Sequence, residues 1–130
     1  MVIEFFMPML PPTITHQQHK VKTVNGKPVF YDPPELKDAR QKLTANLIPN
    51  IPEQPFTTAV RLTTKWLFPK GQHKNGEWKT TKPDTDNMIK LLKDCMTVCR
   101  FWKDDALVVS EITEKFWADI PGIYVRIEEL

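Results

Sequence analysis

The strongest constraint on the fold is the pattern of residues 59–68, AVRLTTKWLF, which alternates between two faces of an extended chain. Successive side chains of a β-strand point to opposite sides, so every second residue shares a face. Here that face consists of Val60, Leu62, Thr64, Trp66 and Phe68. A strand with one largely apolar face needs a covering layer, so we expect a sheet with helices packed on it.

Three further segments have the composition of strands: residues 2–9, 106–116 and 123–129. A β-hairpin is expected in residues 19–31, HKVKTVNGKPVFY, because Asn25-Gly26 stands between two short apolar segments. This dipeptide is typical of a type I′ hairpin turn.

Two helices are expected between the strands. In residues 35–49 the apolar positions Leu36, Ala39, Leu43 and Leu47 recur at helical spacing. A second helix starts near Asp84 or Asp86. Its apolar stripe consists of Met88, Leu91, Leu92, Cys95 and Cys99. The two cysteines have no histidine nearby, so we interpret them as small buried side chains and not as a zinc site.

The length of 130 residues, without repeats or a linker, predicts one domain over residues 1–130. The fold class is α/β (α+β): a mixed sheet of about four strands with two main helices, in the order β-(hairpin)-α-β-α-β-β. No apolar run reaches the roughly 20 residues that a membrane helix needs. The first ten residues include Glu4 and lack the features of a signal peptide, so a cytoplasmic protein without a membrane partner is expected.

Four aspartates flank the second helix in two close pairs, Asp84 with Asp86 and Asp104 with Asp105. A single aspartate at a helix start is ordinarily a cap, but capping does not explain two pairs. Two like charges about 4 Å apart repel by about 4 kcal/mol at an effective dielectric constant near 20. Converging carboxylates therefore need a cation, and hard oxygen ligands suit Mg²⁺ or Mn²⁺.

Lys90 lies four residues after Asp86, roughly 40° around the helix and one turn along. An ordinary Asp–Lys pair on a helix surface would explain this spacing. The alternative is that Lys90 contacts a scissile phosphate or stabilises charge in the transition state. Carboxylates that hold a divalent metal, together with a lysine, are suited to phosphodiester hydrolysis.

The length of the helix limits how the two aspartate pairs can meet. A helix from Asp86 to Cys99 is about 20 Å long, and the six steps from Cys99 to Asp105 reach roughly 20–22 Å at most. Asp105 therefore joins Asp84 and Asp86 if the helix ends near Thr97 and the chain doubles back. Otherwise a second subunit must complete the site. We favour the first arrangement.

Residues 84–109, DTDNMIKLLKDCMTVCRFWKDDALVV, resemble the signature of RusA-type Holliday junction resolvases, which are phage and prophage endonucleases. Leu107 departs from the polar residue usual in this family, and Arg100 stands where some members have a helix-ending glycine. The matching positions are Asp84, Asp86, Asn87, Lys90, Asp94, Trp102, Asp104 and Asp105.

The resemblance implies a Mg²⁺-dependent crossover junction endodeoxyribonuclease of DNA recombination and repair. It implies that a homodimer resolves four-way junctions by paired symmetric nicks. It also implies that Asp84, Asp86 and Asp105 are essential acids and metal ligands, with Asp104 auxiliary and Lys90 catalytic.

Basic side chains in two loops are candidates for contacts with DNA phosphates, although lysines in loops are often simply solvated. Trp78 is the best candidate among the tryptophans for stacking on a base. The candidate DNA-binding residues are Lys70, Lys74, Lys79, Lys82, His16, His19, Lys20 and Asn87.

Two other functions fit the same sequence. One is a nuclease that acts on other branched or flap DNA, because a ligand set does not encode substrate shape. The other is a non-catalytic phage DNA-binding protein in which the aspartates cap helices and form surface ion pairs. The second alternative predicts that the protein does not bind Mg²⁺.

Overall fold

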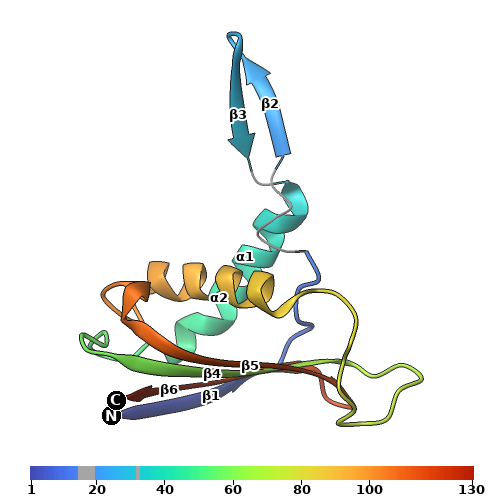
Figure 1. Cartoon of the computed structure of the whole chain (residues 1–130), viewed down its shortest axis with the longest axis vertical. Helices are drawn as coiled ribbons and strands as arrows, with labels where there is room; N and C mark the ends of the chain where they lie inside the picture. Colours follow the sequence, from blue (N-terminus) through green and yellow to red (C-terminus); the bar gives the residue numbers. More distant parts are fainter. Residues whose placement is uncertain (15–19, 32) are drawn as a thin grey trace.

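The computed structural model describes residues 1–14, 20–31 and 33–130 and confirms the expected order of elements. Two helices lie on one face of a four-stranded mixed sheet, and a separate two-stranded hairpin extends beyond them (Figure 1). The elements are β1 (Val2–Met7), β2 (Lys20–Val24), β3 (Lys27–Tyr31), α1 (Pro34–Leu47), the 3₁₀ turn η1 (Ile48–Asn50), β4 (Val60–Pro69), α2 (Thr85–Val98), the 3₁₀ turn η2 (Asp105–Leu107), β5 (Val108–Ala118) and β6 (Gly122–Glu129).

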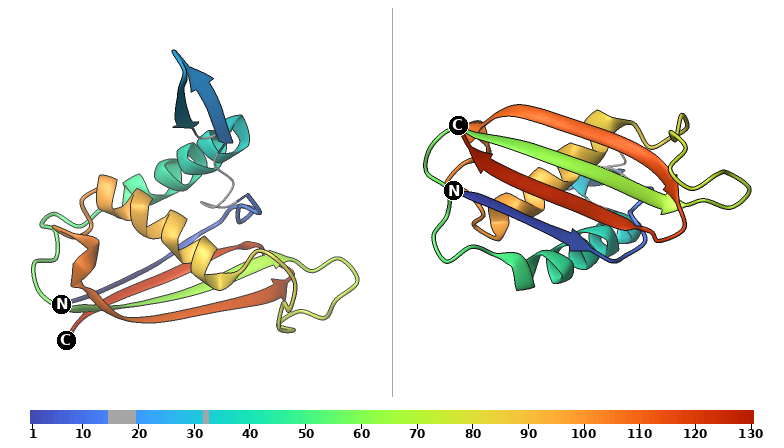
Figure 2. Two further views of the ribbon diagram at one scale, coloured as in Figure 1. Left: turned by 45° about the horizontal axis from the view of Figure 1, so that its top comes forward. Right: turned by 90° about the horizontal axis from the view of Figure 1, so that it is seen from below.

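The strands of the main sheet follow the order β1-β6-β4-β5. β4 and β5 are parallel, while the β1–β6 and β6–β4 pairs are antiparallel. Parallel neighbours need a crossover connection, and α2 supplies it. Both helices lie on the same face of the sheet, and the termini meet at one of its corners (Figure 2). The Met1 ammonium lies 3.1 Å from the Glu129 carboxylate there.

The core lies between the sheet and the helices. All five residues of the predicted inner face of β4 are buried, as are the four predicted apolar positions of α1. In α2 the buried set includes the expected stripe from Met88 to Cys95 together with Asn87, Ile89 and Met96. Cys95 is buried and Cys99 is partly exposed, and burial raises the pKa of both thiols.

The hairpin formed by β2 and β3 has the predicted turn. Asn25 and Gly26 have φ angles of 51° and 76°, and positive φ at both central residues defines the type I′ turn. Glycine adopts such angles without steric cost, and asparagine tolerates them better than most residues. None of the described helices is long and apolar enough to cross a membrane.

The lysine-rich segment after β4, residues 70–82, is exposed over residues 71–78, as expected for a loop, but differs from a simple exposed loop toward its end. Its last part pairs with the edge of β5, since the Trp117 N–H donates to the Glu77 carbonyl at 2.8 Å and the Lys79 N–H to the Lys115 carbonyl at 3.1 Å. Trp78 forms an antiparallel bridge with Phe116. Lys79 is consequently buried, with 8% of its surface exposed.

Candidate active site

The first pair of aspartates lies at the start of α2. Asp84 is the N-cap residue, with extended backbone (φ −73°, ψ 147°), and its carbonyl accepts the first helical hydrogen bond from the Met88 N–H at 3.1 Å. Its carboxylate makes no capping hydrogen bond, although capping is the ordinary role at this position. Asp86 stands in the first helical turn, and both side chains are exposed.

Neither carboxylate of this pair has a hydrogen-bond or ion-pair partner within the described part of the chain. The same is true of Lys90, which is exposed one turn after Asp86. Negative charge is favourable at this end of a helix because the unpaired N–H groups of the first turn point toward it. The start of α2 therefore exposes two carboxylates and one ammonium group that no described residue pairs with.

The second pair of aspartates lies on η2, just before β5. The Asp104 carboxylate accepts a hydrogen bond from the Ala106 N–H at 2.8 Å, so it caps this short turn. Asp105 is the first residue of η2 and is exposed. Its carboxylate has no partner among the described residues.

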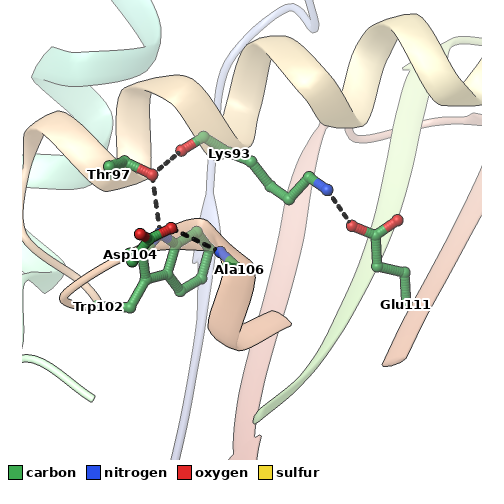
Figure 3. A network of polar contacts seen from close by, with 6 residues as sticks. All are labelled: Lys93, Thr97, Trp102, Asp104, Ala106 and Glu111. Atoms are coloured by element: carbon green, nitrogen blue, oxygen red, sulfur yellow. Dashed lines mark hydrogen bonds and ion pairs between the residues drawn. The ribbon is translucent and has the colours of Figure 1, made fainter. Parts of the chain in front are cut away.

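Trp102 fixes this second pair against the C-terminal half of α2 (Figure 3). Its buried indole N–H donates to the Thr97 hydroxyl at 2.8 Å, and that hydroxyl donates to the Lys93 carbonyl at 2.8 Å. An ion pair between Lys93 and Glu111 also ties α2 to β5. The main chain at Trp102 also forms a parallel bridge with Phe56. Asp104 and Asp105 therefore follow closely after Trp102, whose position is fixed by its contacts with α2 and Phe56.

The structure does not bring the two aspartate pairs together within one chain. α2 ends at Val98, close to the expected position, but η2 packs beside the C-terminal half of the helix. Asp84 precedes the other end, and the 14 residues of α2 span about 20 Å. Among the described residues no group of three His, Cys, Asp or Glu side chains is placed to hold a metal. The favoured arrangement, in which Asp105 closes the site of its own chain, is therefore not found.

The candidate DNA-binding residues fall into three groups: exposed or partly exposed, buried, and outside the described residues. The first group lies on the segment after β4. Lys74 and Lys82 are exposed, and Lys70 is partly exposed with its ammonium 3.8 Å from an Asp119 oxygen. Trp78 is 59% exposed, and its ring stacks on Phe116 with the centroids 4.6 Å apart.

Two candidates are buried instead. Asn87 is 9% exposed on the core side of α2, and Lys79 directs its ammonium toward groups of its own chain. His16 and His19 lie outside the described residues, as does the side chain of Lys20, whose backbone begins β2.

Lys115 lies next to the first aspartate pair, and no pattern in the sequence identifies it as part of the site. The Lys115 ammonium on β5 donates to the carbonyls of Thr81 and Pro83, next to Asp84. Burial, and then the charge of Lys115, lower the pKa of Lys79. The sequence offers one weak indication of a special role for Lys115. From Asp104 onward there are seven acids and two basic residues, Lys115 and Arg126.

Comparison with known proteins gives a family match and two relatives. The model of the family "Endodeoxyribonuclease RusA" matches residues 10–128. The crossover junction endodeoxyribonuclease rusA of Lactococcus phage r1t is 36% identical over 130 residues, which cover 98% of this chain and 96% of the phage protein. The uncharacterized protein YqaN of Bacillus subtilis (strain 168) is 30% identical over 118 residues, 82% of each chain. The family match includes both aspartate pairs and Lys90.

Proposed function

Because the chain belongs to the RusA family of endodeoxyribonucleases, we propose that it resolves Holliday junctions by paired symmetric nicks. Similarity over nearly the full length to a phage crossover junction endodeoxyribonuclease supports this substrate. The observation that carries the chemistry is at the start of α2, where the carboxylates of Asp84 and Asp86 and the nearby ammonium of Lys90 have no partner among the described residues.

The proposed cofactor is Mg²⁺, with Mn²⁺ as a substitute. Asp84, Asp86 and Asp105 are the proposed ligands, with Asp104 in an auxiliary role. The donor set fits such an ion, because all four side chains offer hard oxygen atoms. When bound, the ion supplies an activated water molecule and positive charge beside the phosphate.

Asp105 and Asp104 differ in how free they are to serve as ligands. The Asp105 carboxylate has no competing partner in the described part of the chain, whereas one oxygen of Asp104 accepts the Ala106 N–H. This difference supports the essential role for Asp105 and the auxiliary role for Asp104.

Lys90 is the proposed electrostatic catalyst. Its ammonium projects from the same side of α2 as Asp86, one turn further along the helix. From there it can contact a non-bridging oxygen of the scissile phosphate and stabilise the charge that develops during cleavage. The absence of an ion pair with the described residues leaves its donors available for that contact.

We further propose a homodimer in which Asp105 of one subunit completes the site formed by Asp84 and Asp86 of the other. The separation of the two pairs along α2 supports this arrangement over closure within one chain. A two-fold dimer has two identical sites, which suits two symmetric cuts.

The proposed phosphate contacts are Lys70, Lys74 and Lys82, joined by His16, His19 and Lys20. Such contacts make binding weaken steeply with salt. Trp78 remains a candidate for stacking on an exposed base. Lys79 and Asn87 are removed from this set because both side chains are buried.

The decisive experiment is a cleavage assay on a four-way junction, with flap and linear duplexes in parallel and with Mg²⁺, Mn²⁺ or no metal. We expect the wild type to cut the junction in preference to the other substrates. Asp84→Asn should keep junction affinity within about twofold and slow cleavage by about 100-fold or more. Asp38→Asn, at an exposed position of α1, is the matched control and should cut normally.

Three outcomes contradict the proposal in different ways. Full cleavage by Asp84→Asn would show that Asp84 is not a required metal ligand. Equal cutting of flap DNA would favour the broader branched-DNA nuclease, and absence of cutting with junction binding intact would favour a non-catalytic DNA-binding protein.

A further inference from the structure

Two lysines hold the three residues that lead into Asp84. The Lys115 ammonium donates to the Thr81 carbonyl at 2.7 Å and to the Pro83 carbonyl at 2.8 Å. The Lys79 ammonium donates to the intervening Lys82 carbonyl and to the Thr81 hydroxyl, both at 2.6 Å. Three successive carbonyls therefore accept hydrogen bonds from cationic donors, which are stronger than bonds between neutral groups.

Lys79 is itself fixed from several directions. Its ammonium lies 4.4 Å from the centroid of the Trp117 ring and 5.1 Å from that of Phe68, distances at which cations are attracted to aromatic faces. Its backbone N–H donates to the Lys115 carbonyl, so the two lysines are also joined through the main chain. The desolvation that lowers the pKa of Lys79 agrees with this enclosed position.

The contacts determine the orientation of Asp84. The carbonyl before it, that of Pro83, accepts from Lys115, and its own carbonyl accepts from the Met88 N–H at 3.1 Å. The peptide groups on both sides of Asp84 are therefore held, which fixes the direction of its Cα–Cβ bond. The same hydrogen bonds fix where α2 starts, and they therefore also fix the position of Asp86 in its first turn.

We propose that Lys79 and Lys115 are positioning residues that hold the segment Thr81–Pro83 and thereby place the carboxylates of Asp84 and Asp86 for metal binding. This inference rests on the proposed function, because it concerns the same site. In this role neither lysine touches the substrate. A purely structural role, in which the lysines only join the loop to β5, predicts a loss of stability without a change in metal affinity.

The test compares Lys115→Met and Lys79→Met with Lys65→Met, which removes an exposed lysine from β4 in the same sheet. Three quantities are measured for each protein: Mn²⁺ affinity by calorimetry without DNA, junction affinity without metal, and single-turnover junction cleavage as a function of Mg²⁺ concentration. Thr81→Val removes one contact of Lys79 without changing a charge. It is the variant to use if a lysine variant does not fold.

We expect Lys115→Met and Lys79→Met to weaken Mn²⁺ binding about tenfold or more and to raise the Mg²⁺ concentration needed for half-maximal cleavage by a similar factor. Junction affinity without metal should stay within about twofold. Thr81→Val should shift the same quantities by a smaller factor, and Lys65→Met should leave all of them unchanged.

Wild-type metal affinity in Lys115→Met, Lys79→Met and Thr81→Val would overturn the positioning role. In that case normal cleavage by the wild type and its loss in Asp84→Asn would still support the proposed function. If the wild type binds Mn²⁺ but cuts no junction, the proposed function fails while the affinity comparison still decides the role of the lysines. A wild type that binds no Mn²⁺ overturns both.

Discussion

Individual side chains at the start of α2 distinguish this helix from an ordinary surface helix. An N-cap aspartate commonly accepts a hydrogen bond from the first turn, yet Asp84 does not, and Asp86 and Lys90 form no pair despite favourable spacing. Three charged groups thus forgo local partners within the described part of the chain. Such groups are available to a ligand, and this is the residue-level basis of the proposed site.

Lys90→Gln provides a test at this scale. If the ammonium stabilises charge in the transition state, its loss should slow single-turnover cleavage at saturating junction by about 100-fold while junction affinity changes little. Rapid-quench measurement of cleavage, with binding measured separately, checks both parts. Lys37→Gln, at an exposed position of α1, is the control. Weakened binding with a normal cleavage rate would instead make Lys90 an ordinary phosphate contact.

At the level of elements, α2 is followed by a residue in an unfavourable backbone conformation. Arg100 has a φ angle of 67°, in the left-handed region. The N–H groups of Arg100 and Phe101 donate to the carbonyls of Thr97 and Met96, which is the hydrogen-bond pattern of a Schellman motif. Glycine usually occupies the left-handed position of this motif, because other residues there bring Cβ close to a carbonyl oxygen.

Arg100→Gly should therefore raise the free energy of unfolding by about 1 kcal/mol. Urea denaturation of both proteins measures this difference. Arg100→Ala is the matched control, because alanine loses the same side chain but retains Cβ, and it should show no comparable gain. Equal stabilisation by both substitutions would locate the effect in the arginine side chain and not in the backbone angle.

The elements with a regular apolar pattern could be predicted from the sequence, while those held by irregular contacts could not. The alternation in β4 and the helical spacing in α1 identified their buried residues, because one face of each packs on the core. The pairing of residues 77–79 with β5 depends on main-chain hydrogen bonds, which leave no side-chain pattern. For the same reason Lys79 was expected to be solvated or bound to DNA.

The candidate site shows the same division between features that local patterns predict and features that depend on long-range contacts. The start of α2 follows from local signals, namely a proline and two aspartates before an apolar stripe. The position of η2 depends on the contact between Trp102 and Thr97 and on the pairing with Phe56, which join separate parts of the chain. The hydrogen bonds of Lys115 also span more than 30 residues. Spacing along the sequence does not encode such contacts.

At the scale of the whole molecule, the two aspartate pairs of the proposed site are separated within one chain. Asp84 and Asp86 lie at the start of α2, and the turn η2, which begins with Asp105, lies beside the C-terminal half of the helix. A two-fold dimer in which each pair meets the partner's complementary pair restores two complete sites. This arrangement makes a prediction about mixed dimers that closure within one chain does not make.

Dimers that combine an Asp84→Asn subunit with an Asp105→Asn subunit should regain one intact site, although each variant is inactive alone. One site receives both substitutions, and the other receives none. On a supercoiled plasmid with an extruded cruciform, the mixed dimer should produce nicked circles, whereas the wild type with two active sites should produce linear molecules. Co-expression with two different affinity tags isolates the mixed dimer.

The control combines Asp84→Asn with Asp86→Asn. These residues come from the same end of α2, so each site of that mixed dimer carries one substitution and should stay inactive. If the dimer of Asp84→Asn with Asp105→Asn also stays inactive, the result would indicate that Asp105 completes the site of its own chain.

The crossover between the parallel strands β4 and β5 gives the molecule a fixed internal dimension. α2 separates the two aspartate pairs, and each residue added to a helix lengthens it by about 1.5 Å and turns everything beyond it by about 100°. Over evolution, insertions and deletions should therefore be tolerated in the exposed turns at Gly71 and Gly76 and be selected against within α2. In the proposed dimer, the same count of residues would help to set the spacing between the two proposed cuts.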